Sequence, residues 1–304
     1  GDNMKIGIPN ALFIRDKIIM YSKFLNYNNI DTVISSDTSL KTIEDGVELA
    51  TSEDCIASKI FLGHVNELVN LYRNNYLDAI LVPRVYKQKN NIEGCVKALA
   101  LYDILNNIFR DVKFIDVNVD YSKNITYFKS LINLGITLGI NSKNRFLGAF
   151  YALQEQNKFE KNRYMKQFEN INFKKKNVLV IGNEYIVNDK YIKRLVISSL
   201  NNVNIIFACI NNKVNRYKNI SDQVYFANSI NIMNGVEEYI DFADACIFIT
   251  GFPCATDSLV NEMIKERING IPYIEIMVDE NTSSTGIVTR MESFSDIIEG
   301  RRYI

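Results

Sequence analysis

Short apolar runs alternate along the chain with longer stretches in which apolar residues recur every three or four positions. The short runs are rich in Ile, Val and Phe, which is typical of buried strands, and the longer stretches have the period of an amphipathic helix. Strands that alternate with helices predict a parallel sheet covered by helices on both faces. We predict strands in two groups of four: residues 5–9, 31–35, 78–83 and 112–117, then residues 177–182, 203–210, 244–250 and 271–278.

The second group repeats the scheme of the first, so we expect an α/β protein of two Rossmann-like, doubly wound lobes with parallel sheets, joined by a helical segment. Residues 141–176 have helical spacing and contain no proline, and the charge-rich stretch NFKKKN ends them. We therefore expect an N-terminal α/β lobe at 4–140, a bridging helical segment at 141–176 and a C-terminal α/β lobe at 177–304. The two lobes would enclose a cleft.

Charge and motifs narrow the classes of partner. Lysine plus arginine equals aspartate plus glutamate, 35 each, so no basic field attracts nucleic acid or an anionic membrane. No apolar run approaches the roughly 20 residues of a membrane span, and the chain starts without a signal-peptide core, which favours a cytoplasmic location. Neither a dinucleotide nor a P-loop glycine motif occurs, so we do not expect the chain itself to bind ATP. A small molecule or another protein is the expected partner.

Five cysteines are widely spaced and odd in number, which is not typical of a disulfide framework. Cys209 and Cys246 lie in apolar strand runs, where cysteine is usually a small buried hydrophobe. Cys55, Cys95 and Cys254 each lie in a loop directly before a predicted helix. Loops that follow the carboxyl ends of strands collect the chemistry of open parallel sheets, and a helix N-terminus favours the metal-binding thiolate.

The spacing of these three cysteines leaves two interpretations open: three ligands that converge in one cleft, or three unrelated loop thiols. The only histidine, His64, lies too far along its helix to share a metal ion with Cys55. Three thiolates that leave one iron open suit an iron–sulfur cluster better than a structural zinc ion.

Several segments together carry a resemblance to a known family. They are KIGIPNALFIRD, EDCIASKIFLGHV, DAILVPRV, PCATDSLVNEMI and VDENTSSTGIVTRMESFSDII. The chain resembles the activase-associated branch of the 2-hydroxyacyl-CoA dehydratase family (acyl-CoA dehydratase activase-related, DUF2229-like), from Met4 to the last helix.

The resemblance implies a function and a set of ligands. Cys55, Cys95 and Cys254 match the cysteines that hold a [4Fe–4S] cluster, and three thiolates indicate one cubane cluster per chain. An ATP-hydrolysing activase with its own cluster would supply a low-potential electron, and the protein would reduce or dehydrate a small substrate such as a CoA thioester. A homodimer and a second dehydratase-like subunit are both expected arrangements. The alternatives are a non-catalytic electron-relay or activase-partner subunit and a cluster-free binding protein of the same fold.

Three positions depart from the family pattern. Ala57 stands where the family usually has proline after the first cluster cysteine, Val96 stands where it has proline after the second, and Asn281 replaces a histidine in the acidic segment. The last change bears on proton transfer, and none of the three removes a ligand.

Other polar residues have two interpretations each. Glu53 is a candidate catalytic proton donor, or an acid that complements a helix dipole. Asp257 and Ser258 are expected to cap the helix after Cys254. Four further polar residues are left without an assigned role: Lys59, His64, Arg84 and Arg290. The two arginines are expected either to pair with Glu280 and Glu292 or to bind an anion.

Overall fold

The computed structural model describes residues 3–89, 92–169, 171–212, 224–268 and 270–300. The chain divides into two compact units: unit 1 comprises residues 1–54 and 58–161, and unit 2 comprises residues 55–57 and 162–304. The lobe boundaries expected from the sequence stay a prediction, and residues 90–91, 170, 213–223, 269 and 301–304 of the expected segments lie outside the described residues.

Unit 1 is built on one mixed sheet. Its parallel strands have the order β2-β1-β3-β5, and the short β4 pairs antiparallel with the end of β3. The strands are β1 (Lys5–Ile8), β2 (Asp31–Ile34), β3 (Ala79–Gln88), β4 (Ile92–Glu93) and β5 (Phe114–Asp120).

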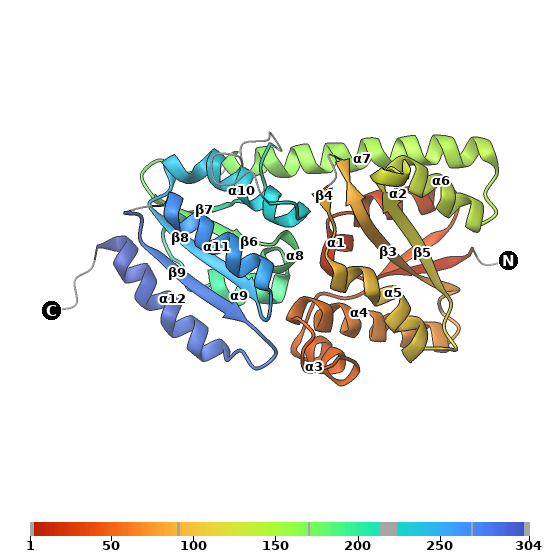
Figure 1. Cartoon of the computed structure of the whole chain (residues 1–304), viewed down its shortest axis with the longest axis horizontal. Coiled ribbons are helices and arrows are strands. Elements are labelled where there is room, and N and C mark those ends of the chain that lie inside the picture. The colour runs from red at the N-terminus through yellow and green to blue at the C-terminus, as the bar shows by residue number, and fades with distance from the viewer. Residues whose placement is uncertain (1–2, 90–91, 170, 213–223, 269, 301–304) are drawn as a thin grey trace. The chain divides into compact units, whose positions relative to one another are not determined.

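The helices of unit 1 cover both faces of this sheet. Because each crossover between parallel strands is right-handed, α2 lies on one face, and α4 and α5 lie on the other (Figure 1). The helices are α1 (Leu12–Arg15), α2 (Ile18–Tyr27), α3 (Leu40–Leu49), α4 (Ile56–Arg73), α5 (Val96–Ile108), η2 (Tyr121–Lys123), α6 (Tyr127–Thr137) and α7 (Ser142–Glu169). The long α7 supplies the helical segment that the sequence predicts between the lobes, and it ends within unit 2.

Unit 2 repeats the same topology. Its four parallel strands have the order β7-β6-β8-β9, so the second strand lies on one side of the first and the third and fourth lie on the other, as in unit 1. The strands are β6 (Lys176–Gly182), β7 (Val203–Phe207), β8 (Ala245–Gly251) and β9 (Tyr273–Val278). Every residue of β8 is buried, as expected for a strand flanked by neighbours and covered on both faces.

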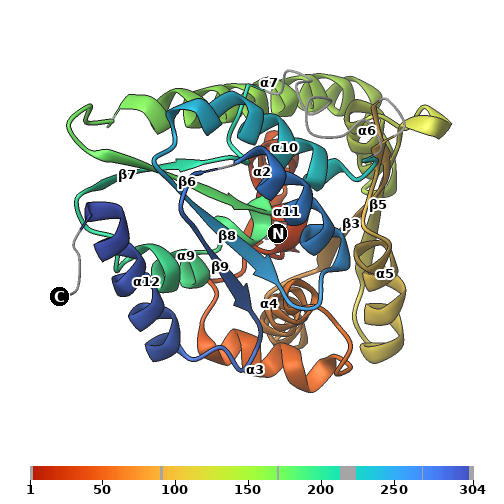
Figure 2. The same cartoon turned by 60° about the vertical axis from the view of Figure 1, so that its left-hand side comes forward.

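The helices of unit 2 are α8 (Glu184–Val187), α9 (Lys190–Ile197), α10 (Ala227–Tyr239), η4 (Ile240–Phe242), α11 (Ala255–Arg267) and α12 (Ser284–Glu299). Figure 2 shows α10 and α11 side by side on one face of the sheet, and α9 and α12 together on the other. The predicted fold class, two doubly wound Rossmann-like lobes with parallel sheets, is confirmed. All eight predicted strands are present, although the strand expected at 203–210 ends at Phe207.

Candidate functional site

The strand order identifies where a ligand site is expected in each unit. In unit 2 the chain leaves β6 toward β7 on one side and later returns to β8 on the other, so the topological switch point lies between the carboxyl ends of β6 and β8. Asn183 directly follows β6, and Cys254 follows β8 after the turn Phe252-Pro253, whose peptide bond is cis. The switch point of unit 2 therefore carries one of the predicted cysteines.

Cys254 is the N-cap residue of α11, and its surroundings disfavour the thiolate. Burial raises the pKa of the Cys254 thiol to about 12, and the nearby negative charge of Asp257 and that of Cys55 act in the same direction. The free thiol is therefore protonated at neutral pH, and a metal ion that binds here has to displace the proton.

Asp257 lies one turn into α11 and is 7% exposed. Burial raises the pKa of its carboxyl group to about 6, although hydrogen bonds from the Cys254 thiol and from Asn183 act to lower it. The amide Nδ2 of Asn183 donates to Oδ2 of Asp257 at 2.5 Å and to the Tyr185 hydroxyl at 3.0 Å. Asp257 therefore binds side chains and not the helix backbone, so its expected capping role is wrong, and Ser258 donates to the Cys254 carbonyl oxygen instead.

Cys55 belongs to unit 2 together with Ile56, Ala57 and Cys254, although the chain before and after residues 55–57 belongs to unit 1. The backbone N–H of Ile56 donates to the carbonyl oxygen of Phe252 at 2.9 Å, which fixes the Cys55 turn against the Cys254 turn. The charge of Cys55 contributes to the raised pKa of Cys254. Two of the three predicted cysteines are thus neighbours.

Cys95 lies in unit 1, at the N-cap of α5. It is exposed, whereas Cys55 and Cys254 are half-buried. Its topological position matches that of Cys254, because each cysteine is the N-cap of the helix that carries the chain from the third to the fourth parallel strand of its unit. The repeat of the fold therefore gives each unit one cysteine at the same place.

The turn before Cys55 holds Glu53, the candidate proton donor. Glu53 is exposed, and its carbonyl oxygen accepts a 2.6 Å hydrogen bond from Nζ of Lys97. Lys97 also lies 3.7 Å from Oδ1 of Asp54, and Asp54 accepts hydrogen bonds from the backbone N–H and hydroxyl of Thr51. Although burial acts to raise it, the Thr51 bonds and the Lys97 charge lower the pKa of Asp54. No contact in this turn assigns a proton-transfer role to the Glu53 carboxylate.

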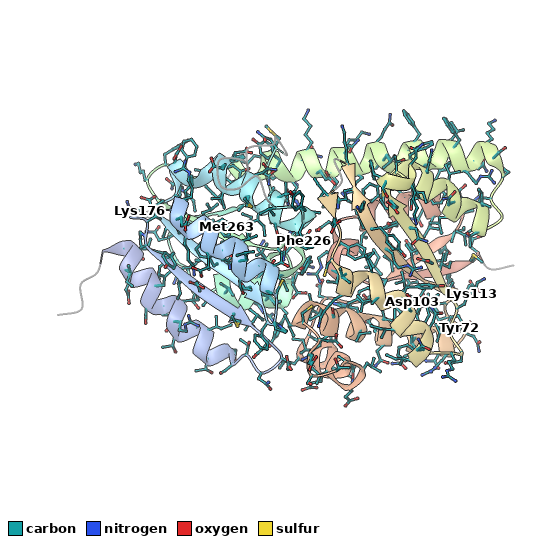
Figure 3. All side chains as sticks on the ribbon, in the orientation of Figure 1. Tyr72, Asp103, Lys113, Lys176, Phe226 and Met263 are labelled. Carbon is teal, nitrogen blue, oxygen red and sulfur yellow. The ribbon has the colours of Figure 1, made fainter. Side chains whose placement is uncertain are left out.

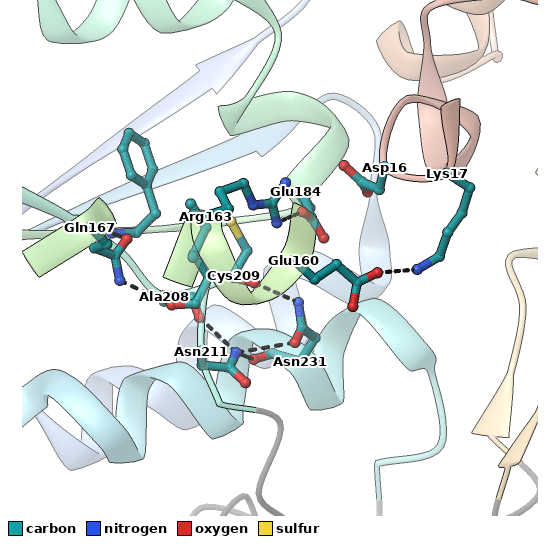
Figure 4. A network of polar contacts seen from close by, with 12 residues as sticks. Asp16, Lys17, Glu160, Arg163, Gln167, Glu184, Ala208, Cys209, Asn211 and Asn231 are labelled. Atoms are coloured by element: carbon teal, nitrogen blue, oxygen red, sulfur yellow. Dashed lines mark hydrogen bonds and ion pairs between the residues drawn. The ribbon is translucent and has the colours of Figure 1, made fainter. Parts of the chain in front are cut away.

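The remaining cysteines are interior residues. Cys246 lies in β8, is fully buried and has a pKa raised to about 12 by burial. Cys209 is 2% exposed but lies in the turn beyond β7, where Asn231 Nδ2 donates to its carbonyl oxygen at 2.9 Å (Figure 4). The expectation that both are buried is confirmed, and the placement of Cys209 inside a strand is wrong.

The other polar residues that the sequence left without a role take part in structural contacts. His64 is fully buried, with its two ring nitrogens 2.9 Å from the hydroxyl groups of Ser35 and Thr38. Lys59 is buried on the same helix.

Neither arginine pairs with the acids that the sequence suggested. Arg84 pairs with Asp116 and, at 3.2 Å, with Asp103, which is labelled on α5 in Figure 3. Arg290 donates to the carbonyl oxygen of Glu275 at 2.6 Å.

Among the described residues, no group of three or more His, Cys, Asp or Glu side chains is assembled that could hold a metal ion. The [4Fe–4S] cluster therefore stays a prediction. Asn183 was not identified from the sequence as a candidate site residue. Its position directly after β6 is the one feature of the sequence that could have indicated it.

Comparison with known proteins defines the family. Residues 5–211 match the model described as "CoA enzyme activase uncharacterised domain (DUF2229)", so the chain belongs to this family. The matched region contains Cys55 and Cys95 and ends before Cys254. The activase-related branch is thereby confirmed, and the dehydratase relationship is not. No curated protein matches the chain.

Two solved structures are similar over most of their length. The SBP FpvC from Pseudomonas aeruginosa in complex with Mn²⁺ has 9% identity, with 99% of this chain and 100% of that chain covered and a TM-score of 0.31. The C-terminal domain of glucosamine-fructose-6-phosphate aminotransferase from Francisella tularensis has 11% identity, with coverage of 98% and 85% and a TM-score of 0.23. These scores carry no argument about function. None of the helices in the described part of the chain is long and apolar enough to cross a membrane.

Proposed function

We propose that this protein carries a [4Fe–4S] cluster on Cys55, Cys95 and Cys254 and acts in the reduction or dehydration of a small substrate such as a CoA thioester. An ATP-hydrolysing activase would be the electron donor. The observation that carries the proposal is the pair of tethers on either side of Cys55. Lys97, two residues after Cys95, binds Glu53 and Asp54, and Ile56 binds Phe252, two residues before Cys254.

The donor set fits an iron–sulfur cluster in type, because cysteine thiolates are the usual ligands of such clusters. Cys95 and Cys254 are both helix N-caps with extended backbone conformations, and neither side chain makes a capping hydrogen bond. The Cys254 thiol instead hydrogen-bonds to Asp257 in the first turn of α11. Cys55 and Cys254 interact electrostatically within unit 2.

The protein's own groups have defined tasks in this proposal. Asp257 accepts a hydrogen bond from the Cys254 thiol, so it would be in place to receive that proton if a metal ion bound the sulfur. Asn183 holds the carboxylate of Asp257 in place. The bound cluster would supply one-electron transfer, and its potential would respond to burial and to hydrogen bonds at the sulfur atoms.

Measurement of iron and acid-labile sulfide on protein purified without oxygen tests the proposal. About four of each per chain, as expected for one cubane, with an electron paramagnetic resonance signal after reduction, would support it. Cys55→Ala, Cys95→Ala and Cys254→Ala should each lose the cluster. Cys246→Ala is the matched control, because this buried cysteine lies in β8 outside the proposed ligand set.

A cluster-free binding protein is the second candidate, and the lack of an assembled metal-holding group among the described residues favours it. If neither iron nor sulfide binds after anaerobic reconstitution, this second function replaces the first. An electron-relay subunit is separated from an enzyme by a different result: the cluster is present and accepts electrons, but no CoA thioester changes its spectrum.

A further inference from the structure

Lys97 occupies an unfavourable place in α5. It is the second residue of the helix, and the first turn of α5 contains no acidic residue. The N-terminal end of a helix carries partial positive charge, so a lysine there is repelled unless another contact compensates. The equivalent turn of α11 has the opposite character, because it contains Asp257.

The compensation comes from the turn that leads to Cys55. Nζ of Lys97 donates to the Glu53 carbonyl oxygen at 2.6 Å and pairs with Asp54 at 3.7 Å. Asp54 is itself fixed by two 2.9 Å hydrogen bonds from Thr51. A single flexible side chain thus connects the first turn of the helix capped by Cys95 to the residues directly before Cys55.

We propose that Lys97 is a positioning residue that holds the first turn of the Cys95 helix against Glu53 and Asp54, the two residues directly before Cys55. The inference rests on the proposed function, because the purpose of the tether is to bring two cluster ligands into register. Lys97 has no metal-ligating role, since it acts through the backbone of Glu53 and through Asp54. Residues that orient metal ligands typically change metal affinity by about ten- to a hundred-fold when they are replaced.

The variants Lys97→Met, Lys97→Arg and Lys41→Met separate positioning from general stability. Lys97→Met removes the charge and keeps the length of the stem, and Lys97→Arg restores a donor. Lys41→Met is the matched control, because Lys41 also pairs with an acid in unit 1, Asp45 at 2.9 Å, which lies on its own helix α3.

Two measurements are made on each protein. The first is the rate at which a chelator removes iron from the reconstituted protein, together with the electron paramagnetic resonance spectrum. We expect about ten-fold faster loss and a changed spectrum for Lys97→Met, recovery for Lys97→Arg and no change for Lys41→Met. The second is the yield of a Cys55–Cys95 cross-link after cluster-free protein is treated with dibromobimane, quantified by peptide mass spectrometry. We expect the wild-type protein to form this cross-link and Lys97→Met to lower its yield.

The outcomes separate this inference from the proposed function. If the wild-type protein binds no iron, the proposed function fails, and the cross-link yields alone decide whether Lys97 positions the two cysteines. If the wild-type protein holds a cluster and Lys97→Met matches it in iron loss, spectrum and cross-link yield, the positioning role is overturned while the proposed function stands. Equal losses in Lys97→Met and Lys41→Met would also overturn it, because that result indicates a general effect of charge.

Discussion

Helices α5 and α11 occupy the same place in the two units but surround their cysteines differently. Each has 13 residues and begins directly after a cysteine N-cap. Three residues after the cysteine, α5 has Ala98 and α11 has the buried acid Asp257. The fold therefore determines where each thiol is placed, whereas burial and the acid in the next turn raise the pKa of the Cys254 thiol.

The largest effect that tests this contrast is the pH dependence of stability caused by Asp257. The folded protein holds the Asp257 proton more tightly than the unfolded chain does, because the pKa rises from 3.8 to about 6 on folding. Stability is therefore lost as the pH rises through this interval, and the ionised carboxylate costs about 3 kcal/mol above it. In metal-free protein, Asp257→Asn should gain stability relative to wild type between about pH 4 and pH 7.

Urea unfolding of both proteins across this range measures the difference in free energy. Asp111→Asn is a control of opposite sign, since a hydrogen bond from Arg73 lowers the pKa of Asp111. If the difference in unfolding free energy between wild type and Asp257→Asn did not change with pH, the buried acid would not distinguish α11 from α5.

The next effect is the reactivity of the two thiols. The thiolate is the nucleophile, and the Cys254 thiol has a pKa raised to about 12, whereas the side chain of Cys95 is exposed. In metal-free protein at about pH 8, iodoacetamide should modify Cys95 about a hundred times faster than Cys254. Peptide mass spectrometry over time gives both rates, and the buried Cys246 serves as the slow reference. Similar rates at Cys95 and Cys254 would show that burial does not govern the second thiol.

The fold was predictable from the sequence because the strands are long apolar runs. The segment predicted at 244–250 is β8, Ala245–Gly251. All of its residues are buried, so its sequence is a continuous apolar run that is easily recognised. The end of β7 was not predictable, because the chain turns where the carbonyl oxygen of Ala208 lies against Gly235, at a position that a Cβ atom would occupy. A close approach between residues far apart in the sequence leaves no local pattern.

The site was predictable only in part for the same reason. Cysteines before helices have a recognisable local sequence, and the prediction placed Cys55, Cys95 and Cys254 correctly in their loops. The contacts that hold these loops join distant residues, 44 positions apart for Lys97 and Glu53 and 74 for Asn183 and Asp257. Only the topological switch point directs attention to such residues, and it requires a known strand order.

A smaller effect is expected one turn further along the two helices. Seven residues after its cysteine, α11 has Asn261, whose amide donates to the buried hydroxyl of Thr250 in β8 at 2.8 Å. Asn261→Ala leaves that hydroxyl buried without its partner and should cost about 1–2 kcal/mol. Urea unfolding measures the loss, with Ser258→Ala as the control, because the exposed Ser258 hydroxyl binds only its own helix. If Asn261→Ala lowered the unfolding free energy no more than Ser258→Ala does, the hydrogen bond of Asn261 would not stabilise the packing of α11 on β8.

The smallest effect is at the equivalent position of α5, where Tyr102 replaces Asn261. The guanidinium carbon of Arg84 lies 4.7 Å from the centre of the Tyr102 ring. Tyr102→Leu keeps most of the apolar contact and removes the cation–π interaction, so a loss of about 0.5–1 kcal/mol in unfolding free energy is expected. Because Asp116 and Asp103 still bind Arg84, the arginine remains held after the change. If Tyr102→Leu lowered the unfolding free energy as much as Asn261→Ala does, the contacts at these two positions would stabilise α5 and α11 equally. The difference between the two helices would then be confined to the turn that follows each cysteine.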